Sequence, residues 1–155
     1  MSSSATMRRP SFIPSLVYKD NRAALKWLRE AFGFEVSEVL TDSMDNIVHA
    51  EMTFGDGVVM IGTEYFAWMK SPQAIGGTNT QRVHVRVDKD IDTHYARAVA
   101  AGAKIEMKPA DQFYGDRTYM AADLEGHHWT FFQAVKNVPF ADMEKATGFK
   151  FKPLE

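Results

Sequence analysis

The chain alternates between runs rich in apolar residues and short polar turns. In its first half, runs that suit β-strands lie at 12–18, 34–40, 46–54 and 58–62. Between the first two runs, apolar residues recur at helical spacing, in a segment that Asp20 or Asn21 can begin and Gly33 can end. The first half is therefore predicted to form a strand, a helix and three strands (βαβββ).

The same order of elements returns in the second half. Strands are predicted at 83–87, 103–107, 118–122 and 128–133. A helix follows the first of them, and a residue of the segment 88–90 can cap it. Three landmark pairs are separated by 68, 69 and 69 residues, namely Asp20 and Asp88, Gly33 and Gly102, and Gly57 and Gly126. A near-constant separation indicates an internal duplication, and chance coincidence is the alternative.

These boundaries predict one domain over residues 11–134. Its two βαβββ modules occupy about 11–62 and 82–134, and the loop 63–81 joins them. Residues 1–10 are expected to be a disordered lead-in, and residues 135–155 an extension with a short helix. The loop contains Tyr65, Phe66, Trp68 and Met69. It is either a linker packed on the domain or an aromatic flap over a ligand site.

Composition narrows the classes of partner. The 18 Lys and Arg residues nearly balance the 20 Asp and Glu residues, so neither nucleic acid nor a membrane surface is predicted as a partner. The chain has no cysteine, which excludes disulfides, thiolate metal sites and cysteine nucleophiles. No apolar stretch is long enough for a membrane span, and the first residues lack the apolar core of a secretory signal. A cytoplasmic location is the expectation.

Three segments resemble the vicinal oxygen chelate superfamily, which includes glyoxalase I and the bleomycin-resistance proteins. They are VYKDNRAALKWLREAFGFEV, VHVRVDKDIDTHYARAVAAGAKI and YGDRTYMAADLEGHHWTFFQ. The last is similar to the final two strands of the bleomycin-resistance branch, except that Leu124 replaces the usual proline. The resemblance implies an α+β fold of two tandem βαβββ modules with curved mixed sheets around a cleft. It also implies a homodimer.

Metal enzymes of this superfamily hold a divalent ion with side chains from the first and last strands of each module. Carried onto this sequence, those positions fall at Ile13, Arg82, Thr130 and either Met60 or Ile61, with Ile61 favoured by the repeat. Isoleucine, arginine and threonine are not ordinary ligands of divalent metals. The prediction is therefore no metal and no other cofactor, with a divalent metal on displaced ligands as the alternative.

Strand alternation predicts which residues line the cleft instead. Arg82 and His84 share one strand face, and His128 and Thr130 share another. Together they form a partly cationic ligand-binding site, in which His84 and His128 are the candidate catalytic residues.

Four further residues are candidates for ligand binding. His49 and Glu51 face the same way on one strand and could bind metal or relay protons, although a half-exposed polar face is the alternative. Tyr114 and Arg117 match a segment at the rim of the ligand groove in the bleomycin-resistance branch.

The remaining histidines and tryptophans are expected to have structural roles. His94 and His127 are predicted to be solvent-exposed, and Trp27 and Trp129 to lie in the core.

Three functions remain open. The first is a bleomycin-resistance type of protein that binds a polar or planar organic molecule without changing it. The second is a metal-dependent lyase, isomerase or dioxygenase. The third is a metal-free enzyme in which a cleft histidine acts as acid or base and Arg82 holds a substrate oxyanion.

Overall fold

The structure is a computed structural model that describes residues 9–155, so most of the lead-in predicted for 1–10 lies outside the described residues. The first module contains β1 (Ser15–Val17), α1 (Asn21–Phe32), β2 (Glu35–Thr41), β3 (Ile47–Phe54) and β4 (Gly57–Gly62). The second contains β5 (Arg82–Arg86), α2 (Ile91–Ala100), β6 (Lys104–Asp111), β7 (Asp116–Ala122) and β8 (His128–Ala134). A 3-10 turn, η1 (Pro72–Ile75), lies in the connecting loop, and α3 (Phe140–Thr147) follows β8. The predicted fold of two βαβββ modules is confirmed.

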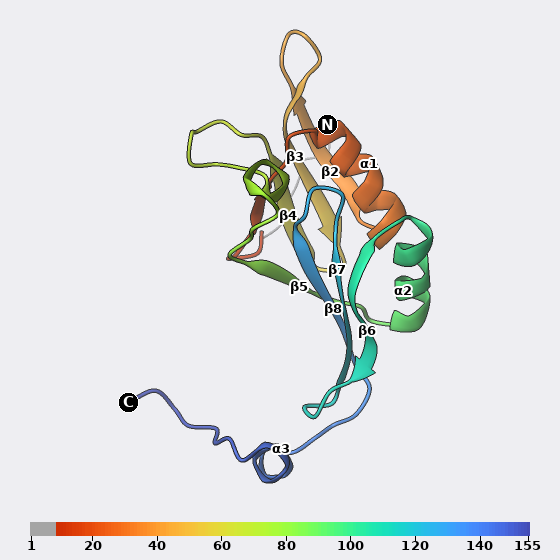
Figure 1. Cartoon of the computed structure of the whole chain (residues 1–155), viewed down its shortest axis with the longest axis vertical. Coiled ribbons are helices and arrows are strands. Elements are labelled where there is room, and N and C mark those ends of the chain that lie inside the picture. Colours follow the sequence, from red (N-terminus) through yellow and green to blue (C-terminus); the bar gives the residue numbers. More distant parts are fainter. Residues whose placement is uncertain (1–8) are drawn as a thin grey trace, which may run out of the picture.

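Each module forms one four-stranded mixed sheet. The strand orders are β1-β4-β3-β2 and β5-β8-β7-β6, and only the β1–β4 and β5–β8 pairs are parallel. One face of each sheet is covered by the helix of its module, and α1 and α2 pack against each other (Figure 1). The opposite face of each sheet carries no helix of its own module, and we call it the open face.

The helix boundaries follow from local capping. The Asp20 carboxylate accepts a hydrogen bond from the Ala23 amide at 3.0 Å, which satisfies a free N–H in the first turn of α1. Gly33 ends α1 in the left-handed conformation, with φ of 74°. In the second module Asp90 caps α2 in the same way.

The core lies between the two helices and the covered faces of both sheets. Its largest buried side chains are aromatic, and the Phe32 ring contacts both Trp129 and Phe131. Trp129 is fully buried, and the partly buried Trp27 donates from its indole N–H to the Ala101 carbonyl at 2.9 Å. The core positions predicted for both tryptophans are confirmed.

Two buried carboxylates in the β7–β8 turn join the modules. Asp123 accepts hydrogen bonds from the Tyr18 hydroxyl at 2.5 Å, from the Trp129 indole at 3.0 Å and from two backbone amides of its own turn. Burial, together with the Asp123 charge, raises the pKa of Tyr18 well above its ordinary value, so this hydroxyl stays protonated and donates. Asp123 is thus a fully partnered buried charge that ties β8 to β1.

Glu125 extends the same junction to the start of α1 and to the connecting loop. Its Oε1 accepts from the Lys19 amide at 2.7 Å and the Ser71 hydroxyl at 2.6 Å, and its Oε2 accepts from the Asp20 amide at 3.0 Å. Three segments far apart in the sequence therefore meet at one carboxylate.

The junction also explains one wrong prediction. His127 was expected to be solvated, but it is only 8% exposed, and its Nε2 donates to the Val17 carbonyl at 2.7 Å. Its ring packs on the buried Tyr18 ring of the first module, with centroids 4.6 Å apart. The first module covers it because the β7–β8 turn packs against the β1–α1 connection.

Two strand boundaries also differ from those predicted. β1 begins only at Ser15, since Pro14 has no N–H for a sheet ladder. β6 continues to Asp111, with Pro109 tolerated because β6 is an edge strand. No helix among residues 9–155 is both long enough and apolar enough to cross a bilayer.

We expect Tyr18→Phe to lower the free energy of unfolding by about 1.5–3 kcal/mol, because it removes a buried hydrogen bond to a charged group. Urea denaturation measures this loss. Tyr65→Phe is the matched control, since it removes an exposed hydroxyl that donates to the Val48 carbonyl, and it should cost about 0.5 kcal/mol or less. Equal losses for the two variants would contradict a stabilising role for the junction.

Candidate functional site

The open face of the second sheet brings four of the predicted site residues together. In the parallel β5–β8 pair, Arg82 lies opposite His128 and His84 lies opposite Thr130. Directly paired residues point to the same side of a sheet. The intervening residues, such as Trp129, point into the core. Arg82, His84, His128 and Thr130 therefore lie on one face of this sheet.

Arg82 and His84 contact each other on this face. The Arg82 Nε–H donates to Nε2 of His84 at 3.2 Å, so Nε2 carries no proton and the imidazole is neutral. Burial, and then the charge of Arg82, lowers the pKa of His84. The pair thus combines a permanent cation with a neutral imidazole.

His128 and Thr130 have different surroundings. His128 Nδ1 lies 2.5 Å from a carboxylate oxygen of Glu106, which β6 supplies. Thr130 is 5% exposed, and its hydroxyl has no hydrogen-bond partner among the described residues. A buried hydroxyl without a partner is uncommon, but Thr130 lines neither of the two cavities described below, so it does not join the other three residues at a ligand site.

Arg82 and His128 also line a hollow of about 380 Å³ between β1 and β5, which we call the β1–β5 hollow. Ser15 and Val17 line it from β1, and residues 68–70 of the connecting loop form another wall. Trp68 is 78% exposed and stacks nearly parallel on Phe66, with ring centroids 5.6 Å apart. This position fits the aromatic flap that was one of the two interpretations of the loop.

A larger cavity of about 620 Å³ lies at the other end of β5, and we call it the hairpin cavity. The β3–β4 turn at 54–57 and the β5–α2 connection at 87–90 form two of its walls. His84 and Arg86 line it from the open face. His84 therefore lies at the hairpin cavity, while Arg82 and His128 lie at the β1–β5 hollow.

His49 and Glu51 lie elsewhere, on the open face of the first sheet, and they line neither cavity. Glu51 is buried and forms an ion pair with Arg9. The hydrogen bond from Arg9 is the main reason that the pKa of Glu51 is lowered. The structure gives Glu51 a partner within the chain and does not bring it to the Arg82 group.

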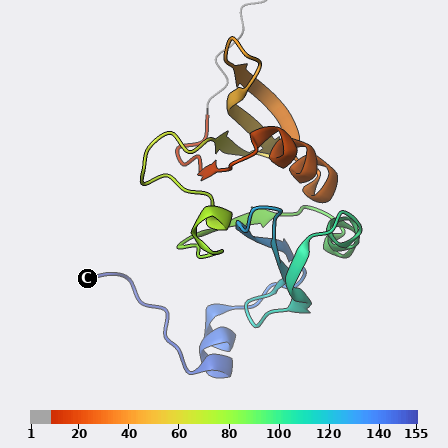
Figure 2. The same ribbon diagram turned by 45° about the horizontal axis from the view of Figure 1, so that its top comes forward.

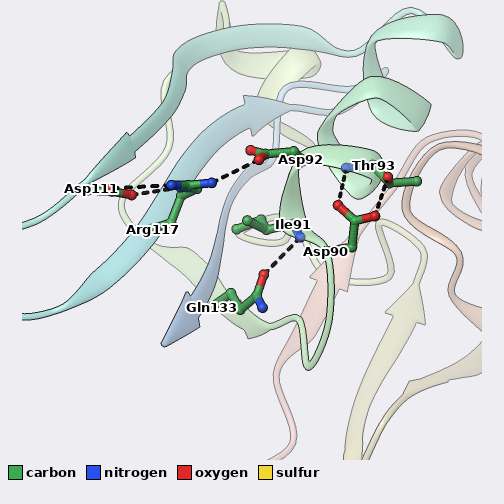
Figure 3. Close-up of polar contacts among 7 residues, drawn as sticks. All are labelled: Asp90, Ile91, Asp92, Thr93, Asp111, Arg117 and Gln133. Carbon is green, nitrogen blue, oxygen red and sulfur yellow. Dashed lines mark hydrogen bonds and ion pairs between the residues drawn. The ribbon is translucent and has the colours of Figure 1, made fainter. Parts of the chain in front are cut away.

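Arg117 points to the side of its sheet opposite to Arg82. It lies opposite Gln133 in the β7–β8 ladder, on the face that α2 covers. Figure 3 shows its guanidinium between Asp111 of β6, at 2.7 Å, and Asp92 of α2, at 2.9 Å. Gln133 accepts from the Ile91 amide beside it. Arg117 therefore holds the start of α2 on the sheet, away from the predicted ligand face.

Tyr114 also lies outside the Arg82 group. It is in the β6–β7 turn, is 40% exposed, and meets the Phe113 ring edge-on at 5.1 Å between centroids. It lines neither the β1–β5 hollow nor the hairpin cavity.

His94 was predicted to lie at the surface, and this was wrong. Its Nε2–H donates to the Phe32 carbonyl at 2.8 Å, which leaves Nδ1 to accept from the Tyr119 hydroxyl at 2.6 Å. Burial is the largest cause of its lowered pKa. Its spacing from the buried residues Ile91 and Ala98 places it on the inner stripe of α2, and this signal was present in the sequence.

The residues at the superfamily's usual metal positions do not fit a divalent ion. Met60 lies opposite Glu51 and Ser15 on the open face, whereas Ile61 is buried under α1, so the preference for Ile61 was wrong. The four side chains are then Ile13, Met60, Arg82 and Thr130. They offer no carboxylate and no imidazole, and a guanidinium repels a cation. Within residues 9–155, no three His, Asp or Glu side chains gather as a metal site would need.

Comparisons with known proteins agree with this architecture. A family model described as Glyoxalase/Bleomycin resistance protein/Dioxygenase superfamily matches residues 12–131. The uncharacterized protein Rv0887c of Mycobacterium tuberculosis is 30% identical over 141 residues, covering 88% of this chain and 82% of that protein.

Two solved structures illustrate the structural similarity. TioX from Micromonospora sp. ML1 is 34% identical, with a TM-score of 0.66, over 80% of this chain and 98% of TioX. A glyoxalase-related enzyme from Clostridium phytofermentans is 14% identical, with a TM-score of 0.62, over 86% of this chain and all of that one (100%). At such low identity the second likeness concerns the fold alone.

His94 makes a prediction about pH. Its pKa is lower in the folded chain than the unfolded value of about 6.5, so the unfolded chain binds more protons as the pH falls below about 6.5. The contribution of neutral His94 is therefore present above that pH and decreases below it. Unfolding midpoints measured from pH 7.5 to 5.5 should fall less steeply for His94→Gln than for the unmodified chain. Parallel slopes would contradict this role.

Proposed function

Because this chain belongs to the Glyoxalase/Bleomycin resistance protein/Dioxygenase superfamily, we propose that it binds a small, flat organic anion in the β1–β5 hollow. The observation that carries the proposal is the convergence of Arg82 and His128, from two adjacent strands, on a hollow whose third wall contains Trp68.

Arg82 supplies the charge that selects an anion. An arginine guanidinium is a permanent cation and presents a planar set of N–H donors that matches a carboxylate. The contact of Arg82 with a neutral imidazole uses only Nε, which leaves the terminal nitrogens for a ligand. The acidic side chain Glu106 contacts His128, and it would orient the imidazole of that histidine.

Trp68 favours a flat ligand. An exposed indole beside a hollow can stack on an aromatic ring, and the parallel Phe66 behind it limits the freedom of the indole. Aromatic carboxylates combine the ring and the charge that these two walls would bind. Binding without conversion would sequester such a molecule, as proteins of the bleomycin-resistance type do, and an aromatic antibiotic is one such ligand.

A metal-free acid–base enzyme is the second candidate, and the state of His84 favours it. The lowered pKa keeps this imidazole neutral near pH 7, as a general base must be, and Arg82 beside it could stabilise a developing oxyanion. The metal-dependent alternative has no comparable support, because the donor set at the superfamily positions does not suit a divalent ion.

The binding proposal predicts an affinity that depends on charge. Titration calorimetry should show that 2-naphthoate binds and that the uncharged 2-naphthalenemethanol binds at least about tenfold more weakly, since a charged hydrogen bond is lost. Arg82→Gln should weaken 2-naphthoate binding by a similar factor. Arg117→Gln is the matched control and should leave binding unchanged, because Arg117 faces the other side of the sheet. Equal binding by both compounds, or no effect of Arg82→Gln, would contradict the proposal.

The state of His84 makes a separate prediction. Arg82→Gln removes the second cause of the lowered pKa but leaves burial, so the pKa of His84 should rise only part of the way to its ordinary value. Nitrogen-detected NMR titration of the imidazole measures this shift. An unchanged His84 pKa in Arg82→Gln would show that the two side chains are not in contact in solution.

A further inference from the structure

The internal repeat relates the two cavities to each other. A shift of 69 residues carries residues 15–17 of the β1–β5 hollow onto residues 84–86 of the hairpin cavity. In β4 and β8 the paired residues Met60 and Thr130 set the shift at 70, which carries residues 57 and 58 of the hairpin cavity onto 127 and 128 of the hollow. The cavities are therefore equivalent places in the two modules, although one is about 380 Å³ and the other about 620 Å³.

The connecting loop accounts for the difference at the smaller cavity. Residues 68–70 line the hollow, and the next residue, Ser71, is fully buried with its hydroxyl on Glu125. Pro72 packs closely on Gly126, and the Gln73 amide donates to the Glu125 carbonyl at 3.0 Å. The chain that leaves β4 thus turns back and closes one side of this junction.

The equivalent chain after β8 does not turn back. Phe140 at the start of α3 lies one residue before the position that corresponds to Ser71, yet Phe140 is 65% exposed, whereas Ser71 is completely buried. Residues 137–147 do not line the hairpin cavity. Figures 1 and 2 show α3 and the chain end projecting away from both modules. Within residues 9–155, no segment after β8 gives the hairpin cavity the wall that residues 68–72 give its counterpart.

A tight contact at Gly115 directs the C-terminal segment outward. The amides of Val135 and Lys136 both donate to the Gly115 carbonyl, at 3.0 and 2.9 Å. Gly115 has φ of 101°, and a Cβ built there would lie 2.0 Å from the Lys136 carbonyl oxygen, so only glycine permits this approach. These contacts fix the direction in which the segment leaves β8.

The outward segment carries aromatic side chains that the described part of its own chain leaves largely uncovered. Phe140 and Phe151 stack with centroids 4.3 Å apart, and Phe149 is 74% exposed. Exposed aromatic clusters usually mark an interaction surface. The hairpin cavity offers a complementary apolar lining, which includes Phe12, Phe34, Val85 and Phe132.

We propose that residues 137–155, the C-terminal arm, fill the hairpin cavity of a second copy of this chain. Reciprocal exchange of the arms gives a closed two-fold dimer, and each arm supplies in trans the wall that residues 68–72 supply in cis at the other cavity. This assignment is independent of the ligand proposed above, since the β1–β5 hollow is closed by its own linker.

The absence of cysteine permits a direct cross-linking test. Two single variants of the full chain, Phe140→Cys and Asp56→Cys, are mixed in equal amounts, oxidised and separated on a non-reducing gel. Asp56 lies in the β3–β4 turn at the cavity, and both positions are exposed, so folding is not at risk. We expect a covalent dimer that forms in the mixture far more than in either variant alone. Met44→Cys replaces Asp56→Cys in the control mixture, since Met44 is exposed but does not line the cavity.

Sedimentation equilibrium of the unmodified chain and of Phe140→Ser provides a second measurement. We expect a dimer whose dissociation constant rises about tenfold or more in Phe140→Ser, as is common when a central aromatic contact is removed. A monomeric unmodified chain, or a dimer unaffected by Phe140→Ser, would overturn the proposal. A double variant Phe140→Cys/Asp56→Cys that forms only an internal disulfide would also overturn it, because the arm would then close on its own chain.

Discussion

The burial of two carboxylates between the modules is the constraint on which the rest of the structure depends. Asp123 and Glu125 are almost fully removed from water, and a buried carboxylate is tolerated only when its oxygens are well supplied with donors. The donors come from the β1–α1 connection, from the connecting loop and from the turn itself. The two sheets are not hydrogen-bonded to each other, so this junction, together with the aromatic core, sets their relative position.

That position determines where a ligand site can exist. With the β7–β8 turn packed against the β1–α1 connection, the edge strands β1 and β5 approach each other and the β1–β5 hollow forms between them. The loop that supplies Ser71 to Glu125 also carries Trp68 to the rim. One set of contacts therefore closes the module junction and places an aromatic side chain beside Arg82 and His128.

The internal repeat produces two equivalent cavities with different walls. At the β1–β5 hollow the connecting loop forms a wall, because the chain after β4 must return to begin β5. No further strand follows β8, so the chain after it does not have to return to the sheet. Its first residues are hydrogen-bonded to Gly115 instead. Near-identical topology thus leaves a smaller hollow, walled by the connecting loop, at one place and a larger apolar cavity at the other. The larger cavity lies in a chain whose C-terminal aromatic segment has no partner outside itself among the described residues.

The sequence by itself determined the order of elements, the duplication and the shared face of Arg82, His84, His128 and Thr130, because strand and helix periods are local properties. It also predicted, from the family resemblance, residues other than the usual metal ligands at those positions. Only the tertiary structure decided which faces meet. His127 is buried by the other module, and Arg117 points away from the ligand face, because both depend on packing between segments distant in sequence. The periodicity of a strand or helix shows which of its sides is apolar. It does not show which other segment, from the same module or the other one, packs against that side.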